Sequence, residues 1–281
     1  MDIQWFPGHM TKARRMIAEN IKLVDGICEV IDARIPFSSR NPDLDEIAGQ
    51  KPRLVILNRI DQADPRATPR WVSSIKESGA AVLETDSKSG RGIGGFAAAI
   101  RALLADRLAY YKSKGQSGHQ IRAMVLGIPN VGKSSFINRV AKRKAAAVAD
   151  KPGVTKGKQW IAIDDGIELL DTPGVLWPRF DDQTVAENLA FTGAIRDEIM
   201  DIETLGANLM LRLMELYPDN VARRYNINID IKDDDGGFAL LTQAAKSRGF
   251  LISGGEVDTN RMAAVLLDEF RSGKLGKVTL E

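Results

Sequence analysis

The segment Gly127-Ile-Pro-Asn-Val-Gly-Lys-Ser134 fits the pattern G-x-x-x-x-G-K-S and decides the fold class of the chain. An apolar run over residues 121–126 precedes it, and a helix is predicted from Ser135 onward. Such a loop curls its backbone N–H groups around a phosphate, and the following helix adds the positive end of its dipole. The segment therefore predicts a nucleoside triphosphate site on an α/β sheet.

Three side chains of this loop have predicted roles. Lys133 is expected to reach the β- and γ-phosphates and to support catalysis, and Ser134 is expected to offer its hydroxyl to Mg²⁺. Asn130 occupies a position shared by GTPases that bind potassium beside the phosphates, where a cation stabilises developing charge. K⁺ is therefore a candidate second ion.

The tetrad Asn58-Arg-Ile-Asp61 indicates which base the bound nucleotide carries. Among the asparagines of the chain only Asn58 has an aspartate three positions on, which fits a guanine-reading box of the form N-[KR]-x-D. Asp61 can accept two hydrogen bonds from the ring N–H and the exocyclic amine of guanine, and Asn58 can meet the acceptor edge of the ring, whereas adenine presents the wrong donors. The box precedes the phosphate loop, although it follows that loop in an ordinary GTPase. The order of parts predicts a circularly permuted domain.

A second acidic loop follows the apolar stretch at residues 167–170. The sequence Asp171-Thr-Pro-Gly174 places a carboxylate where it can hold Mg²⁺ and a glycine whose N–H can meet the γ-phosphate. Thr155, between this loop and the phosphate loop, is the natural second hydroxyl for Mg²⁺. Its alternative is an ordinary surface turn.

The segment Asp86-Ser-Lys88 follows another predicted strand and loosely matches the S-A-K box of GTPases. We expect it to pack under the base, with its backbone N–H groups meeting the guanine carbonyl. The nucleotide-binding candidates are Asn58, Arg59, Ile60, Asp61, Asp86, Ser87, Asn130, Val131, Gly132, Lys133, Ser134, Ser135, Thr155 and Gly174, and the metal-binding candidates are Ser134, Thr155 and Asp171.

Strands predicted at residues 26–31, 53–57, 80–84, 121–126 and 167–170 alternate with helix signals over the first part of the chain, which predicts a doubly wound, mainly parallel sheet. Residues 94–110 read as one long helix, and residues 112–120 read as the join that replaces the usual chain ends, with His119 in solvent. From residue 184 only helices are indicated. The expected domains are a permuted GTPase domain at 1–182 and a small helical domain at 183–281, the latter docking on RNA.

Composition agrees with a well-packed protein. The chain has 281 residues, and 44% of them are hydrophobic, enough for one large or two ordinary cores. No apolar run approaches the length of a membrane span, and Met1 to Trp5 lacks a signal pattern, so a cytoplasmic protein without a membrane partner is expected. Cys28 is the single cysteine, which excludes internal disulfides.

The net charge of +2 hides an asymmetry. Residues 1–182 carry 28 Lys+Arg against 21 Asp+Glu, and residues 183–281 carry 11 against 16. A basic first part suits a polyanion such as RNA, although phosphate-binding residues account for some of this charge. In the acidic second part we expect one local basic face, made of Arg223, Arg224, Lys246, Arg248, Arg271, Lys274 and Lys277.

With the front segments Trp5-Phe-Pro-Gly-His-Met10 and Asp32-Ala-Arg-Ile-Pro36, these motifs closely resemble the YlqF/RbgA family of circularly permuted GTPases. The resemblance covers nearly the whole chain. It implies a ribosome biogenesis GTPase that acts late in assembly of the large (50S) subunit, binds ribosomal RNA and not DNA, and hydrolyses GTP to GDP and phosphate when it meets that particle. Members carry Lys second in the guanine box, where this chain has Arg59.

The usual GTPase motif does not supply a catalytic group in this sequence. Many GTPases orient the attacking water with a Gln directly after D-x-x-G, but Val175 stands there and cannot position water. The histidine of the family maps onto His9, whose imidazole can orient or polarise water near neutral pH. Arg34 and Arg40 could stabilise charge, but pairing with acids such as Asp32 and Asp43 is favoured.

Two other functions fit the same residues. A GTP-gated RNA chaperone or scaffold would hydrolyse GTP only incidentally, as Val175 favours, whereas Lys133, Ser134, Thr155 and Asp171 favour turnover. A signalling GTPase with a protein partner is the weaker alternative.

Overall fold

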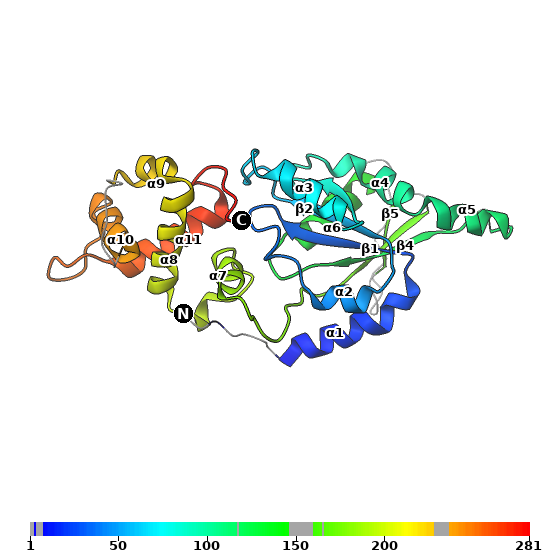
Figure 1. Cartoon of the computed structure of the whole chain (residues 1–281), viewed down its shortest axis with the longest axis horizontal. Coiled ribbons are helices and arrows are strands. Elements are labelled where there is room, and N and C mark those ends of the chain that lie inside the picture. Colours follow the sequence, from blue (N-terminus) through cyan, green and yellow to red (C-terminus); the bar gives the residue numbers. More distant parts are fainter. Residues whose placement is uncertain (1–2, 4–7, 117, 146–159, 165, 228–235) are drawn as a thin grey trace. The chain divides into compact units, whose positions relative to one another are not determined.

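The computed structural model describes residues 3, 8–116, 118–145, 160–164, 166–227 and 236–281. It consists of two compact units: residues 6–179, and residues 180–281 together with the short segment 1–5 (Figure 1). The sequence assigns that first segment to the GTPase domain instead. His119 lies among the described residues, whereas Thr155 lies outside them.

The first unit is built on a six-stranded sheet in the order β3-β2-β1-β4-β6-β5. All neighbouring strands are parallel except β5, which runs antiparallel to β6. The fold class predicted from the sequence, a doubly wound and mainly parallel sheet, is confirmed. The strands are β1 (Gly26–Asp32), β2 (Arg53–Asn58), β3 (Ala81–Glu84), β4 (Ile121–Leu126), β5 (Trp160–Asp164) and β6 (Ile167–Asp171).

The strand order contains one switch point. From β1 the chain proceeds outward through β2 to β3, whereas from β4 it builds β6 and β5 on the other side. Loops that leave neighbouring strands in opposite directions open a crevice at the carboxyl edge, where ligands bind in open α/β sheets. The phosphate loop leaves β4 at this point, and Asn58 ends β2 opposite Asp32 at the end of β1.

Helices cover both faces of the sheet. The helix α3 (Thr68–Glu77) packs Ile75 against Ile31, Val55 and Leu57 on one face. On the other face α4 (Phe96–Leu103) and α6 (Lys133–Ala145) meet through an edge-to-face contact of Phe96 with Phe136, with ring centroids 5.2 Å apart. The remaining elements of this unit are α1 (Gly8–Asn20), η1 (Ile21–Leu23), α2 (Asp43–Ala48), η2 (Ile93–Gly95) and α5 (Ala105–Ser113).

The long helix predicted over residues 94–110 is wrong in detail, because it consists of α4 and α5 with a break at Leu104. Leu104 is buried beside Gly26 at the start of β1, and its backbone leaves the helical region with φ −102° and ψ 15°. Burial of this one side chain outweighs the helix propensity of the Ala/Leu run.

The second unit is helical in its described residues. Its elements are α7 (Gln183–Phe191), η3 (Asp197–Ile199), α8 (Ile202–Leu216), α9 (Pro218–Tyr225), α10 (Gly236–Ser247) and α11 (Thr259–Ser272). Asp182, Asp201 and Asp258 accept N-cap hydrogen bonds at the starts of α7, α8 and α11. The backbone N–H of Ile3 donates to Gln183 at 2.9 Å. No helix among the described residues is long and apolar enough to cross a membrane.

A buried carboxylate holds three elements of the helical unit together. Glu269 is 5% exposed and accepts hydrogen bonds from Arg224, Tyr225 and Arg248. Burial alone would raise the pKa of Glu269, but these hydrogen bonds and the two guanidinium charges lower it to about 2. Arg271 is likewise paired, with Asp197 at 2.6 Å.

These ion pairs correct the basic face expected in this unit. Three of its seven members, Arg224, Arg248 and Arg271, face internal acids and stabilise the fold. The members left exposed outside these pairs are Arg223, Lys246, Lys274 and Lys277.

Glu269→Gln should destabilise the helical unit by about 3 kcal/mol, because a buried site loses the anion that pairs with Arg224 and Arg248. Since the folded pKa lies below the unfolded value, the stabilising contribution is present above pH about 4.5 and is lost as the pH falls toward 2. Amide hydrogen exchange of α11 as a function of pH measures both effects. Glu215→Gln, which breaks an exposed pair with Arg212, is the control. Equal stability of the two variants would contradict this account.

Candidate nucleotide site

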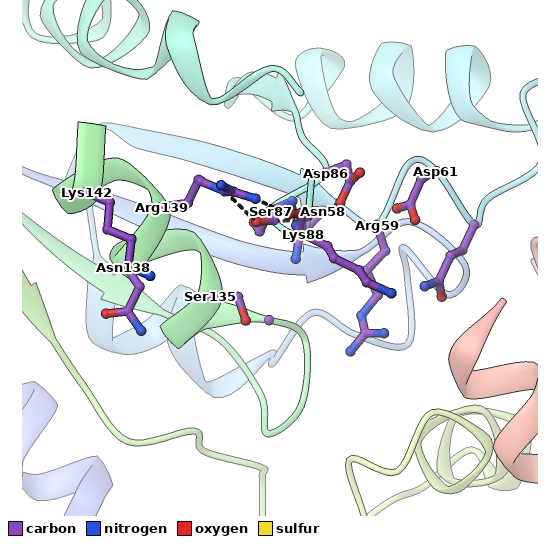
Figure 2. A pocket seen from close by; sticks show the side chains of 12 residues that line it. Asn58, Arg59, Asp61, Asp86, Ser87, Lys88, Ser135, Asn138, Arg139 and Lys142 are labelled. Atoms are coloured by element: carbon purple, nitrogen blue, oxygen red, sulfur yellow. Dashed lines mark hydrogen bonds between the residues drawn. The ribbon is translucent and has the colours of Figure 1, made fainter. Parts of the chain in front are cut away.

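A cavity of about 440 Å³ lies at the carboxyl edge of the sheet, where the sequence predicts the nucleotide (Figure 2). The loops after β2, β3 and β4 and one face of α6 form its walls. The lining residues are Asn58, Arg59, Asp61, Gln62, Asp86, Ser87, Lys88, Gly132, Ser135, Asn138, Arg139 and Lys142.

Asn58 connects three of these loops. Its amide nitrogen donates to the carbonyl of Val131 in the phosphate loop at 2.8 Å. Its amide oxygen accepts from the backbone N–H and the hydroxyl of Ser87, at 3.0 and 2.8 Å, and from the Thr85 hydroxyl at 3.2 Å. The side chain is 2% exposed, so these bonds fix the relative positions of the guanine box, the Ser87 loop and the phosphate loop.

Arg59 makes a second connection to the phosphate loop. Its guanidinium donates to the carbonyl of Asn130 at 2.8 Å and lies 3.4 Å from the carboxylate of Asp32. The backbone of Arg59 is left-handed, with φ 63°, which turns the chain sharply after β2. The guanidinium therefore combines a hydrogen bond to the phosphate loop with an ion pair to Asp32, which suits its branched head group better than a lysine ammonium.

The predicted pairing of Arg34 with Asp32 is confirmed. Two nitrogens of Arg34 donate to Asp32 at 3.0 and 2.7 Å, and both side chains are almost fully buried. Burial opposes ionisation of Asp32, but the neighbouring charge of Arg34 lowers its pKa. Arg40 approaches Glu29 at 3.7 Å and Asp45 at 3.9 Å, so Asp43 is not its partner.

The loop at residues 86–88 differs from the expectation that its N–H groups meet the guanine carbonyl. The N–H of Ser87 donates to Asn58, and the N–H of Lys88 donates to the Asp86 carboxylate at 2.8 Å. Arg139 on α6 holds this loop from outside by donating to the carbonyls of Ser87 and Lys88. The loop is thus pre-formed by protein contacts.

The phosphate loop has the backbone that its glycines predict. Gly127 and Gly132 have φ values of 156° and 91°, and Asn130 is left-handed with φ 61°. A Cβ at Gly132 would collide with the amide nitrogen of Asn58. Helix α6 begins at Lys133, so its N-terminus faces the site, as expected for an anion-binding loop.

The loop after β6 is fastened to the phosphate loop. The Thr172 hydroxyl donates to the carbonyl of Val125 at 2.7 Å, and the N–H of Val175 donates to the carbonyl of Gly127 at 3.2 Å. A Cβ at Gly174 would lie 2.8 Å from the backbone nitrogen of Pro129, a distance that leaves room for glycine alone. Val175 is 1% exposed and therefore points into the core.

One carboxylate of this region fits a phosphate-bound divalent cation. The Asp171 oxygen Oδ1 is buried and has no hydrogen-bond partner among the described residues. Burial lowers the pKa of the Lys133 ammonium, and the charge of Asp171 acts in the opposite direction. An orphaned carboxylate oxygen is the kind of ligand that Mg²⁺ takes, so the residues present fit the ion.

Two predicted site residues stay untested by this geometry. Thr155 lies outside the described residues. His9 is the second residue of α1, so the predicted position near the start of a helix is confirmed, but its side chain lies outside the described part.

The sequence reading missed the contribution of α6. Ser135, Asn138, Arg139 and Lys142 all line the cavity, and their spacing of three, one and three places them on one helical face. That periodicity, counted from the phosphate loop, was the available signal. The role of Asp32 as a partner of Arg59 had no local signal, because it depends on the pairing of β1 with β2.

Fold and site together define a P-loop GTPase whose guanine-reading strand precedes its phosphate-binding strand, a circularly permuted domain. Similar proteins refine this class. The family model described as 50S ribosome-binding GTPase matches residues 122–224, which begin at the phosphate-binding strand.

A "Ribosome biogenesis GTPase A" of Bacillus cereus is 46% identical over 100% of this chain and 94% of its own length, and a protein of the same name in Thermotoga maritima is 31% identical over 99% and 94%. Two solved structures also match: a GDP-bound YlqF (TM-score 0.66, 26% identity, 95% of this chain and 98% of that one) and a GNP-bound YlqF from T. maritima (0.64, 28%, 96% and 97%). The chain belongs to this YlqF/RbgA family of ribosome biogenesis GTPases, and it is a GTPase.

Gly174→Ala tests the contact between the loop after β6 and the phosphate loop. The added methyl would meet backbone atoms of Pro129, which cannot rotate away, so the loop must shift and its N–H must leave the γ-phosphate position. We expect GTP affinity to fall by roughly tenfold or more, with GDP affinity less affected. Gly118→Ala, where a Cβ meets nothing within 4 Å, is the control in titrations of both nucleotides. An unchanged preference between GTP and GDP in Gly174→Ala would refute the γ-phosphate role.

Proposed function

We propose that this GTPase hydrolyses GTP to GDP and phosphate during late assembly of the large (50S) ribosomal subunit, and that docking on the particle stimulates turnover. The observation that carries this proposal is that the guanine box and the phosphate loop line one cavity, while the loop after β6 packs against the phosphate loop. The names of similar proteins, which include ribosome biogenesis and 50S binding, support the cellular process. Such a process implies the cytoplasm and ribosomal RNA as a partner.

Guanine recognition is assigned to Asp61, which lines the cavity beside Arg59. An aspartate can accept from both the ring N–H and the exocyclic amine of guanine. Asn58, whose side chain holds the three loops together, acts by positioning, and Ile60 continues the turn that presents Asp61.

Asp61→Asn should shift preference from guanine to xanthine nucleotides, because xanthine carries a carbonyl where guanine has its amine. The loss of a charge-assisted pair should weaken GTP binding by roughly tenfold to a hundredfold. Competition between GTP and xanthosine triphosphate measures the change, with Asp219→Asn, an exposed aspartate of the helical unit, as control. Equal GTP affinity in wild type and Asp61→Asn would remove the base assignment.

The phosphates are assigned to the loop over residues 130–135. The backbone of Asn130, Val131 and Gly132 cradles the anion, and Lys133 neutralises charge on the transferred group. Ser134, Thr155 and Asp171 would hold Mg²⁺, which supplies charge neutralisation when bound. A potassium ion beside Asn130 is the second ion that we propose.

Water activation is assigned to His9. Val175 follows the glycine of D-x-x-G and is buried, so it offers no polar atom to water. The place of His9 at the start of α1, directly after the segment that leaves the helical unit, lets particle docking bring the imidazole to the γ-phosphate. In that position the imidazole orients the water that attacks the γ-phosphorus. The bond from this phosphorus to the β–γ bridging oxygen breaks, and GDP leaves with that oxygen while the γ-group becomes inorganic phosphate.

His9→Ala should leave GTP and subunit binding nearly intact and lower the stimulated rate by roughly 10²-fold, the effect of a lost water-positioning group. Single-turnover hydrolysis on saturating large subunits measures it. Arg15→Ala, an exposed residue of the same helix, is the control. Wild-type turnover by His9→Ala would transfer catalysis to the ribosome, to potassium at Asn130 or to another residue.

The alternative function, an RNA chaperone gated by GTP, rests on the burial of Val175. It predicts that large subunits leave the hydrolysis rate unchanged, so the same assay separates the two functions.

We further propose that the helical unit docks on ribosomal RNA through the exposed residues Arg223, Lys246, Lys274 and Lys277.

A further inference from the structure

Helix α5 buries none of its side chains. It has 9 residues, and Figure 1 shows the helix extending beyond the sheet. A helix of this length is marginal in water unless tertiary contacts hold it. Its position therefore depends on whatever fastens it to the sheet.

A buried carboxylate connects α5 to the sheet. Asp25, 6% exposed and directly before β1, accepts hydrogen bonds from Arg107 of α5 at 2.8 Å and from the backbone N–H of Arg122 at 2.9 Å. It lies 3.3 Å from the ring nitrogen of His119, and that ring stacks on Tyr111 at 3.7 Å between centroids. The expectation that His119 is a solvated loop residue is wrong, because it completes this anchor.

Asp25 is held in its charged form. Burial opposes its ionisation, but the hydrogen bonds from Arg122, Arg107 and His119 lower its pKa. An ionised, buried carboxylate with several donors is costly to desolvate and gives a rigid connection once satisfied. Asp25 thus holds α5 in a fixed position on the sheet, although the helix buries none of its own side chains.

Tyr110 and Lys112 in the last turn of this helix face solvent together with Lys114, the C-cap residue that follows it. We term these three residues the α5 tip. Tyr110 is 58% exposed, and both lysines are exposed. The Tyr110 ring meets Tyr111 edge to face at 5.9 Å, and the Lys114 ammonium lies 5.8 Å from its centroid. The anchor therefore orients one aromatic ring with cations around it.

Positive charge exceeds negative charge near this helix. Besides the two lysines, Arg107 and Lys51 surround Asp25, and Asp106 is the acidic residue of α5. Burial and the charge of Arg107 lower the pKa of Lys51, while Asp25 acts in the opposite direction. Asp25 and Asp106 together do not neutralise these four cations, so the surface attracts an anion.

We propose that the α5 tip is an RNA-contact surface, where Lys112 and Lys114 contact backbone phosphates and Tyr110 stacks on an unpaired base. The proposal rests on the proposed function, since ribosomal RNA is the RNA concerned, and it adds a contact on the GTPase unit itself. Lysines that contact phosphate and exposed aromatic rings that stack on bases are the two components of single-strand recognition.

The features of the tip favour RNA over a purely structural role. Lysines in the last turn stabilise the helix dipole, which accounts for their charge but not for an exposed, oriented tyrosine. They favour RNA over a protein partner as well, because lysine is depleted at protein interfaces.

The test compares the full-length protein with two tip variants, Tyr110→Ala and the double variant Lys112→Gln with Lys114→Gln. The matched control is Arg70→Gln with Lys76→Gln on α3, two exposed cations of which Lys76 also lies in a last helical turn. Affinity is measured against salt concentration for purified large ribosomal subunits and for a labelled RNA hairpin with an unpaired adenine loop. GTP binding is measured in parallel and should be unchanged in every variant.

The double lysine variant should reduce the salt slope for the hairpin by about 2, one unit for each lost phosphate contact. Tyr110→Ala should weaken hairpin binding roughly tenfold with the slope unchanged. Wild-type slopes and affinities in both tip variants would overturn the proposal. So would weaker subunit binding with unchanged hairpin binding, because a ribosomal protein would then occupy the tip. Failure of the wild-type protein to bind subunits at all would instead refute the proposed function.

Discussion

The carboxamide of Asn58 is the interaction on which the nucleotide site depends. Its nitrogen donates to the phosphate loop and its oxygen accepts from the Ser87 loop, so one buried side chain fixes three loops that leave three different strands. Removing it would leave the carbonyl of Val131 and the hydroxyl of Ser87 without this partner, at a cost of about 1–3 kcal/mol for each buried polar group. Gly132 is the counterpart of this contact, because any side chain there would displace the amide.

Two further side chains strengthen the coupling of these loops. Arg59 reinforces it from the next position by bridging Asn130 and Asp32, and Arg139 closes it from α6. The polar groups that would otherwise compete for the guanine and the phosphates are already paired with one another. Such preorganisation reduces the ordering that nucleotide binding must impose on the loops.

Local signals in the sequence were enough for much of this architecture. The phosphate loop, the guanine box and five of the six strands follow from glycine positions and apolar runs that act within a few residues. Strand β5 was missed because its partner β6 supplies its stability, and the break at Leu104 was missed because burial overrides helix propensity. The partners of Ser87, Arg59 and His119 come from other strands and helices, so no local pattern encodes them.

Circular permutation leaves the helical unit connected to the GTPase unit by two chain segments. The chain crosses between the units at residues 5–6 and again at residues 179–180. The first crossing is followed at once by His9 and α1, and the second comes directly after the loop that carries Gly174 and Val175. In a GTPase of ordinary order neither terminus of the domain would lie at these points. We therefore propose that a shift of the loop that carries Gly174 passes to the helical unit along one covalent connection, and that a response of that unit returns to the segment before His9 along the other.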